Sequence, residues 1–89
     1  MSVYLISYDL KVPGKDYNDL YKEIKSLGDW CHLLESEWFV DTTQTADEIK
    51  TTLRKKMDNN DLILVNKMNK DYSGWLSQTV LDWLDKHLT

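Results

Sequence analysis

Asp9 is the residue whose type and position in this chain best suit chemistry. It directly follows the apolar run VYLISY, so a strand ending there would lift the carboxylate clear of the core. Carboxylate oxygens are ligands that Mg²⁺ and Mn²⁺ prefer, and two copies of Asp9 related by a two-fold axis would share one ion. That ion would assist phosphodiester hydrolysis. The alternative is that Asp9 caps its own turn through the backbone.

The charged residues limit the partners that such a site would have. The one compact basic run, Arg54-Lys55-Lys56, lies at the end of a predicted helix, where cations stabilise the helix dipole. Its alternative role is a small phosphate-contacting patch, which a dimer would double. The chain has 11 Lys and Arg against 15 Asp and Glu, a formal net charge of −4, which disfavours nucleic acid as a partner. We expect a solvated acidic rim formed by Glu35, Glu37, Asp41 and Asp47.

Cysteine and histidine offer no further site in the sequence. The single cysteine, Cys31, excludes an intramolecular disulfide. Cys31 and His32 are neighbours in a predicted strand, so their side chains point to opposite faces and do not form a catalytic pair. His32 and His87 lack metal-ligand spacing. A general-base role for His32 would require a neighbouring strand to bring it close to Asp9, and the alternative is a structural role.

The aromatic residues point to packing or to an interface. Four Trp and five Tyr are many for 89 residues. At the end of the chain they join an apolar helical surface formed by Trp75, Val80, Trp83 and Leu84. We expect this surface to pack on a sheet or across a dimer. The alternative is a groove that binds another protein.

The elements that must position these residues follow from the hydrophobic pattern. Residues 3–10 predict a central strand that is covered on both faces. Asp16 suits the N-cap of a helix that ends before Gly28, which is placed as a C-terminal glycine cap. Residues 29–42 predict a hairpin that breaks near Glu35-Ser36-Glu37, although one long bent strand is an alternative.

The second half of the chain predicts three more elements. Thr45 and Glu48 have the spacing of a capping box, so a second helix begins there. Asp61 leads into residues 62–65, LILV, which predict a buried strand. A polar loop then precedes a third helix, over residues 76–88.

This order predicts one α+β domain over residues 1–89, a ferredoxin-like βαββαβ sandwich with an added C-terminal helix. We expect helices on one sheet face, and the other face open unless the last helix or a second subunit covers it. No run reaches the ~18–20 apolar residues that a membrane span needs. The opening MSVYLISYDL has no basic leader, so we expect a cytoplasmic protein.

The strand VYLISYDL and the element order over residues 3–67 resemble two related families. These are the small CRISPR spacer-acquisition proteins, or second Cas family, and the virulence-associated D-type endoribonucleases. The resemblance implies a homodimer in which Asp9 is the catalytic, metal-binding aspartate for Mg²⁺ or Mn²⁺. Tyr8 matches only as the strand residue beside it. The chain departs from this pattern in its acidic charge, in a first loop without arginine over residues 11–15, and in its final helix, where the families often have a strand.

Two hypotheses follow. The composition favours a small dimeric interaction module that binds protein and is not catalytic. The alternative is a metal-dependent ribonuclease or deoxyribonuclease in which Asp9 from two subunits binds one divalent ion.

Overall fold

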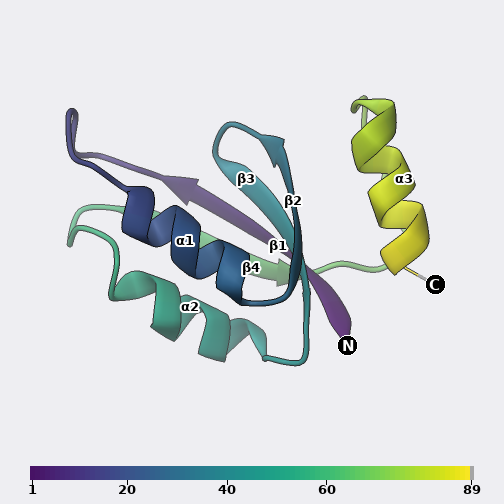
Figure 1. Ribbon diagram of the computed structural model, residues 1–89, viewed down its shortest axis with the longest axis horizontal. Helices are drawn as coiled ribbons and strands as arrows, with labels where there is room; N and C mark the ends of the chain where they lie inside the picture. Colours follow the sequence, from purple (N-terminus) through teal and green to yellow (C-terminus); the bar gives the residue numbers. More distant parts are fainter. Residues whose placement is uncertain (89) are drawn as a thin grey trace.

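A computed structural model describes residues 1–88 and contains four strands and three helices within that range (Figure 1). In chain order they are β1 (Ser2–Asp9), α1 (Asn18–Ser26), β2 (Asp29–Leu34), β3 (Glu37–Thr42), α2 (Ala46–Arg54), β4 (Leu62–Lys67) and α3 (Gln78–His87). No helix in residues 1–88 combines the length and the apolar character that crossing a bilayer requires.

The four strands form one sheet in the order β2-β3-β1-β4, and neighbouring strands run antiparallel. β1 is central: Ile6 lies opposite Trp38 of β3 on one side and Val65 of β4 on the other. β2 and β4 are the edge strands. This α+β arrangement is compatible with the predicted ferredoxin-like sandwich.

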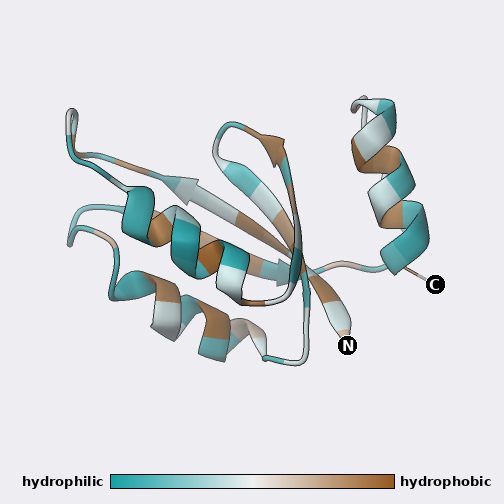
Figure 2. Ribbon diagram, viewed as in Figure 1, coloured by the Kyte–Doolittle hydropathy of each residue, from teal (hydrophilic) through white to brown (hydrophobic). Residues whose placement is uncertain are grey.

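One face of the sheet is covered by α1 and α2, which lie side by side (Figure 1). Alternate residues of β1, namely Tyr4, Ile6 and Tyr8, point into this core. Apolar and polar residues alternate along both helices, as the brown and teal bands in Figure 2 show, and the buried apolar positions include Ile24 and Ile49.

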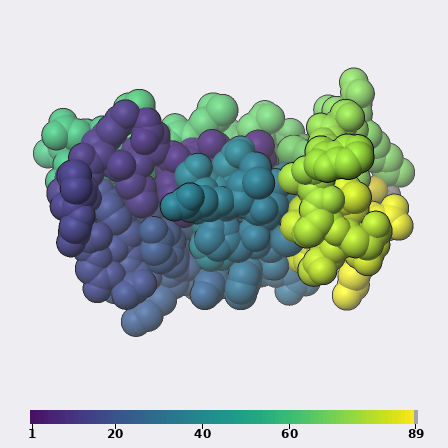
Figure 3. All heavy atoms as spheres, turned by 90° about the horizontal axis from the view of Figure 1, so that it is seen from above, coloured from purple at the N-terminus to yellow at the C-terminus, as the bar shows by residue number. Residues whose placement is uncertain are grey.

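The opposite face is covered in part by α3, which stands apart from the other helices and fills one end of the molecule (Figure 3). Its Val80 and Leu84 are buried against Val3 and Phe39 of the same chain. The last helix therefore covers its own sheet. Ser77 caps its first turn by accepting a hydrogen bond from the Val80 amide.

The predictions for α2 and for the hairpin are confirmed. Thr45 Oγ1 accepts from the Glu48 amide, and Glu48 accepts from the Thr45 amide, so both bonds of the capping box form. β2 and β3 are separate strands joined at Glu35 and Ser36.

Two predictions for the ends of α1 were wrong. The N-cap position is Tyr17, which makes no side-chain capping bond, and Asp16, one residue earlier, accepts a hydrogen bond from the Asn18 amide in a local turn. Gly28 has no positive φ and is not a left-handed cap. Its missing side chain serves a close approach, since a Cβ there would lie 2.1 Å from the backbone oxygen of Asp41.

The prediction that β4 is buried was also wrong. Ile63 and Val65 pack against the core beneath α1 and α2, but Leu62 and Leu64, on the other face, are 59% and 65% exposed. The reason is positional: β4 is an edge strand, and α3 packs against other strands of that face.

A buried carboxylate, Asp61, joins the loops at the end of the sheet where β1 ends and β4 begins. Its oxygens accept hydrogen bonds from the amides of Lys11 and Asp58, each at 2.7 Å, and from the Tyr17 hydroxyl at 2.9 and 3.0 Å. Burial alone would raise the pKa of the Asp61 carboxyl, but these hydrogen bonds lower it below its ordinary value of 3.8. Burial and the neighbouring Asp61 raise the pKa of Tyr17.

We expect Gly28→Ala to destabilise the fold by about 1–3 kcal/mol, because the new methyl group forces β3 and the end of α1 apart. Urea unfolding measures this free energy. Gly74→Ala is the matched control, since its Cβ would meet the Leu76 side chain at an ordinary 3.4 Å. Equal stabilities of the two variants would contradict the close-packing role of Gly28.

We expect Asp61→Asn to lower the unfolding temperature by several degrees at neutral pH, because an amide nitrogen would face a backbone donor. A carboxyl whose pKa is lowered in the folded state adds stability above its unfolded pKa and loses it as the pH falls through the folded value. The difference between wild type and variant should therefore be constant at neutral pH and shrink as the pH falls below 3.8. A difference that does not change with pH would refute this ionised role.

Candidate functional site

Asp9 lies where β1 ends, on the sheet face opposite α1 and α2. Strand alternation places Tyr8 in the helix-covered core and Asp9 on the other face, directly opposite Leu62 of β4. The Asp9 side chain is 61% exposed, and its Oδ2 lies 2.6 Å from Lys11 Nζ. The predicted position of the carboxylate, at a strand end and clear of the core, is confirmed.

One subunit supplies little for a metal ion at this point. Among residues 1–88, no three or more His, Cys, Asp or Glu side chains are grouped so that they would hold an ion. Asp9 offers one carboxylate, and Lys11 neutralises it. A divalent ion here needs oxygen ligands from a second copy, from substrate or from water, together with displacement of Lys11.

Beside Asp9 the sheet carries a bare apolar surface, which we call the β4 patch and define as Leu62, Leu64 and Ser7. With Asp9, these residues line a shallow hollow of about 230 Å³. Ser7 lies opposite Leu64, and Asp9 opposite Leu62, so the four side chains form two adjacent rows on one face. Leu62 and Leu64 are both exposed on the edge strand β4, where another protein surface could contact them.

On the helix side, an aromatic column crosses from β1 to the hairpin. Tyr8 packs against Tyr21, Tyr21 stacks on Trp38, and the His32 ring stacks on Trp38. The Tyr8 hydroxyl accepts from Trp38 Nε1 at 3.0 Å and donates to the Glu35 carbonyl at 3.4 Å. Burial raises the pKa of Tyr8, so this hydroxyl keeps its proton at neutral pH. This column was not predicted from the sequence, because its members are distant in the chain.

The Tyr8 end of the column opens into a pocket of about 490 Å³. The side chains that line it come from β1 and the residue after it, from α1 and from the hairpin turn, namely Tyr8, Asp9, Leu10, Tyr21, Glu35 and Ser36. Asp9 therefore stands between this pocket and the β4 patch. His32 is held elsewhere, by Trp38 and by the Glu35 carbonyl, which supports the structural alternative for this residue.

Asp41 was predicted in the acidic rim, and this was wrong. His87 Nδ1 lies 2.7 Å from Asp41 Oδ2, and both side chains are largely buried. The His87 ring also stacks on Trp83, which stacks on Phe39. Asp41 leaves the rim because α3 packs over its end of β3. The other predicted members of the rim, Glu35, Glu37 and Asp47, are exposed or partly exposed.

Cys31 points away from His32, as predicted. Cys31 packs in the cluster beneath α3, whereas His32 lies on Trp38. Burial raises the pKa of the Cys31 thiol, so it remains protonated and is a poor nucleophile.

The basic run lies at the end of α2. Arg54 donates to the Asp58 carbonyl at 2.9 Å, so its guanidinium stabilises the turn after the helix. Lys55 and Lys56 are exposed. Within this run, the two lysines are the cations that remain open to a phosphate.

The residues predicted for an interface separate into two groups. Val80 and Leu84 are buried within the chain's own core, and Trp83 is partly buried there. Trp75 is fully exposed. Of the four, Trp75 is the one whose side chain is wholly available to a partner.

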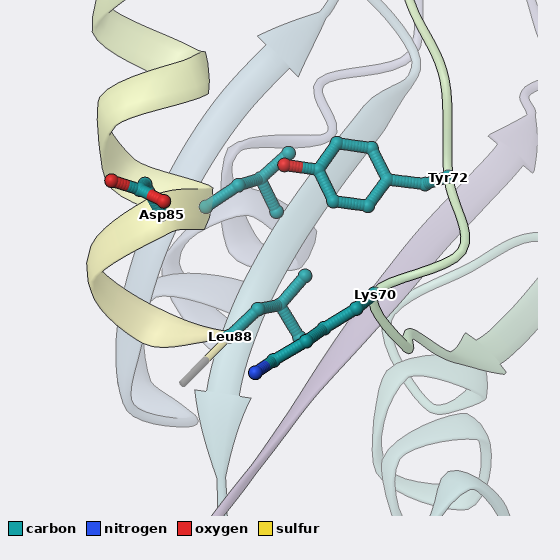
Figure 4. Close-up of a pocket in the computed structure, with 5 residues that line it drawn as sticks. Lys70, Tyr72, Asp85 and Leu88 are labelled. Atoms are coloured by element: carbon teal, nitrogen blue, oxygen red, sulfur yellow. The ribbon is translucent and has the colours of Figure 1, made fainter.

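A pocket of about 480 Å³ lies between α3 and the segment that precedes it (Figure 4). Tyr72 and Lys70 reach toward α3 from that segment, while Leu84, Asp85 and Leu88 line the other side. The lining combines apolar side chains with one lysine and one aspartate, and Leu84 is the one lining residue that the sequence had predicted for an interface.

Comparison with known proteins finds one similarity, which is a similarity in fold. No family model matches the chain, and no curated protein matches it. A solved structure, that of a hypothetical protein TT1823 from Thermus thermophilus, is similar with a TM-score of 0.61 and 16% sequence identity. The match covers 85% of this chain and 94% of that one, so the similarity in fold extends over most of both chains.

Proposed function

We propose that this chain is a ferredoxin-like subunit that acts as a homodimeric interaction module, with the β4 patch as the contact between the two copies. The observation that carries the proposal is the exposure of Leu62 and Leu64 on a sheet face that α3 covers only in part. The strand order β2-β3-β1-β4, with α1 and α2 on one face, supports the ferredoxin-like assignment.

The direction of the side chains indicates how the copies meet. Leu62 and Leu64 project from the face of the sheet, so pairing of two β4 edges would leave them uncovered. Packing the two faces against each other buries them, at the spacing of about 10 Å that stacked sheets adopt. A two-fold axis makes this contact self-complementary, because the same leucines come from each copy.

Composition agrees with a module that binds protein. The net charge of −4 and the paired state of Asp9 supply little for binding a polyanion. Trp75, fully exposed before α3, is the side chain we propose for a protein partner outside the dimer.

We expect Leu64→Glu to convert the dimer into a monomer, because it places two carboxylates in the contact. The mass measured by light scattering should fall from about twice the subunit mass of 10.5 kDa to the subunit mass itself. The matched control is Leu34→Glu, which alters an exposed leucine on the other edge strand, β2, and should remain dimeric. A wild type that is monomeric at every concentration would contradict the proposal.

A metal-dependent nuclease is the second candidate, and one observation favours it. Asp9 lies opposite Leu62 on the face that we propose for the dimer, so that contact would draw the two Asp9 carboxylates together. Two carboxylates from two copies, with water and substrate phosphate, form a set of ligands that suits Mg²⁺ or Mn²⁺.

For this candidate we expect Asp9→Asn to lower the rate of RNA or DNA cleavage in Mg²⁺ or Mn²⁺ at least about a hundredfold, because the metal loses a carboxylate ligand. The dimer and its stability should persist. Gel assays of both nucleic acids measure the rate, and Asp16→Asn, in an exposed loop, is the control. A wild type that cuts neither substrate with either metal would exclude the nuclease and leave the interaction module standing.

A further inference from the structure

The pocket between α3 and the segment before it has two walls of opposite charge (Figure 4). One wall consists of Lys70 and Tyr72, which follow the end of β4, and the Lys70 side chain extends toward the end of α3 at which Leu88 lies. The other wall is the last turn of α3, from which Asp85 contributes to the lining. A cavity of about 480 Å³ is therefore bordered by one ammonium and one carboxylate.

The backbone makes the α3 wall negative for a second reason. The last carbonyls of a helix have no partner within the helix, so this end carries a partial negative charge. The two cations of the last turn are directed elsewhere. His87 Nδ1 lies 2.7 Å from Asp41 Oδ2 of β3, and Lys86, two positions after Leu84, falls on the other side of the helix. This wall therefore suits the ammonium group of a ligand.

The charges of Lys70 and Asp85 are available to a ligand. Both side chains are exposed, and in the part of the chain that the structure describes neither forms an ion pair. The rest of the lining is formed by the fully buried Leu84, the partly buried Leu88 and the Tyr72 ring. A ligand that matches this pocket carries a negative group, a positive group and an apolar group.

We propose that this pocket binds a free α-amino acid with an apolar side chain. The carboxylate of the ligand pairs with Lys70, and its ammonium pairs with Asp85 at the end of α3. Its side chain packs on Leu84, Leu88 and Tyr72. A concave site of a few hundred Å³, mostly apolar with a few polar groups that fix orientation, is the usual form of a small-molecule site. A ligand with a single charge matches one wall only, so the pocket discriminates against it.

The pocket is separate from the proposed dimer contact. The β4 patch lies at the start of β4, whereas Lys70 and Tyr72 follow the end of that strand, and the two sites share no residue. Failure of one proposal therefore leaves the other testable in the same protein.

A nuclear magnetic resonance titration of the full chain with L-leucine tests the assignment. We expect saturable shifts of the methyl signals of Leu84 and Leu88, which line the pocket. Two matched probes separate the charges: isocaproate lacks the ammonium group of leucine, and isoamylamine lacks its carboxylate. L-leucine should bind about tenfold or more tightly than either probe, because each probe loses one charged hydrogen bond.

Substitutions assign each charge to its wall. Lys70→Met should weaken leucine binding about tenfold and leave isoamylamine binding unchanged. Asp85→Asn should weaken leucine binding by a similar factor and leave isocaproate binding unchanged. Asp82→Asn is the matched control, because it removes a carboxylate of α3 that lies outside the pocket and accepts a hydrogen bond from Gln78. This variant should bind leucine as the wild type does.

Three results would overturn the proposal. The first is a titration in which leucine shifts none of the methyl signals that line the pocket. The second is equal affinity for leucine and for one of its singly charged analogues, which would assign the pocket to a ligand with one charge. The third is unchanged leucine binding in both the Lys70→Met and the Asp85→Asn variants.

Discussion

Within residues 1–88, three helices are available to cover the two faces of the sheet, and this number limits how much apolar surface the chain can bury by itself. A four-stranded sheet has two faces, and α1 with α2 covers one of them. The other face has only α3, a helix of 10 residues that spans about 15 Å and packs at one end. The far end, with Leu62 and Leu64, lies bare. Covering this apolar area with a second surface removes it from water, which lowers the free energy of the system.

Hydrogen bonds stabilise the end of the sheet at which Leu62 and Leu64 are exposed. Asp61 joins the loop after β1, the start of α1 and the turn before β4 through hydrogen bonds to one buried carboxylate. Tyr8 and Trp38 fix the hairpin turn by a second set of bonds. These hydrogen bonds therefore fix the end of the sheet from which Asp9 and the β4 patch project.

The elements that depend on local pattern were predictable from sequence. The capping box of α2 and the apolar stripe of α3 each follow from residues within one or two turns of each other. Three features depend on contacts between distant residues and were not predictable. Asp41 pairs with His87, 46 positions away, and Asp61 bonds to Tyr17, 44 positions away. The run LILV is compatible with a central strand and with an edge strand, because the hydrophobic pattern shows which face a side chain occupies and does not show how many strands lie beside it.

The candidate site shows the same division. The position of Asp9 at a strand end was predictable, since it depends only on where an apolar run stops. Its ion pair with Lys11 and its place beside Leu62 were not, because they depend on a turn and on strand pairing. The column from Tyr8 to His32 joins three strands and a helix, so no pattern of neighbouring residues in the sequence predicts it.

We propose that a second copy covers the bare end of the sheet, and contacts between protons of the two subunits show whether it does. The measurement is an isotope-filtered nuclear Overhauser experiment on a mixture of labelled and unlabelled chains. If the β4 patch is the contact, we expect intermolecular signals from the methyl groups of Leu62 and Leu64 to protons of the other copy. A dimer whose intermolecular signals come from Trp75 or α3, with none from these leucines, would contradict it.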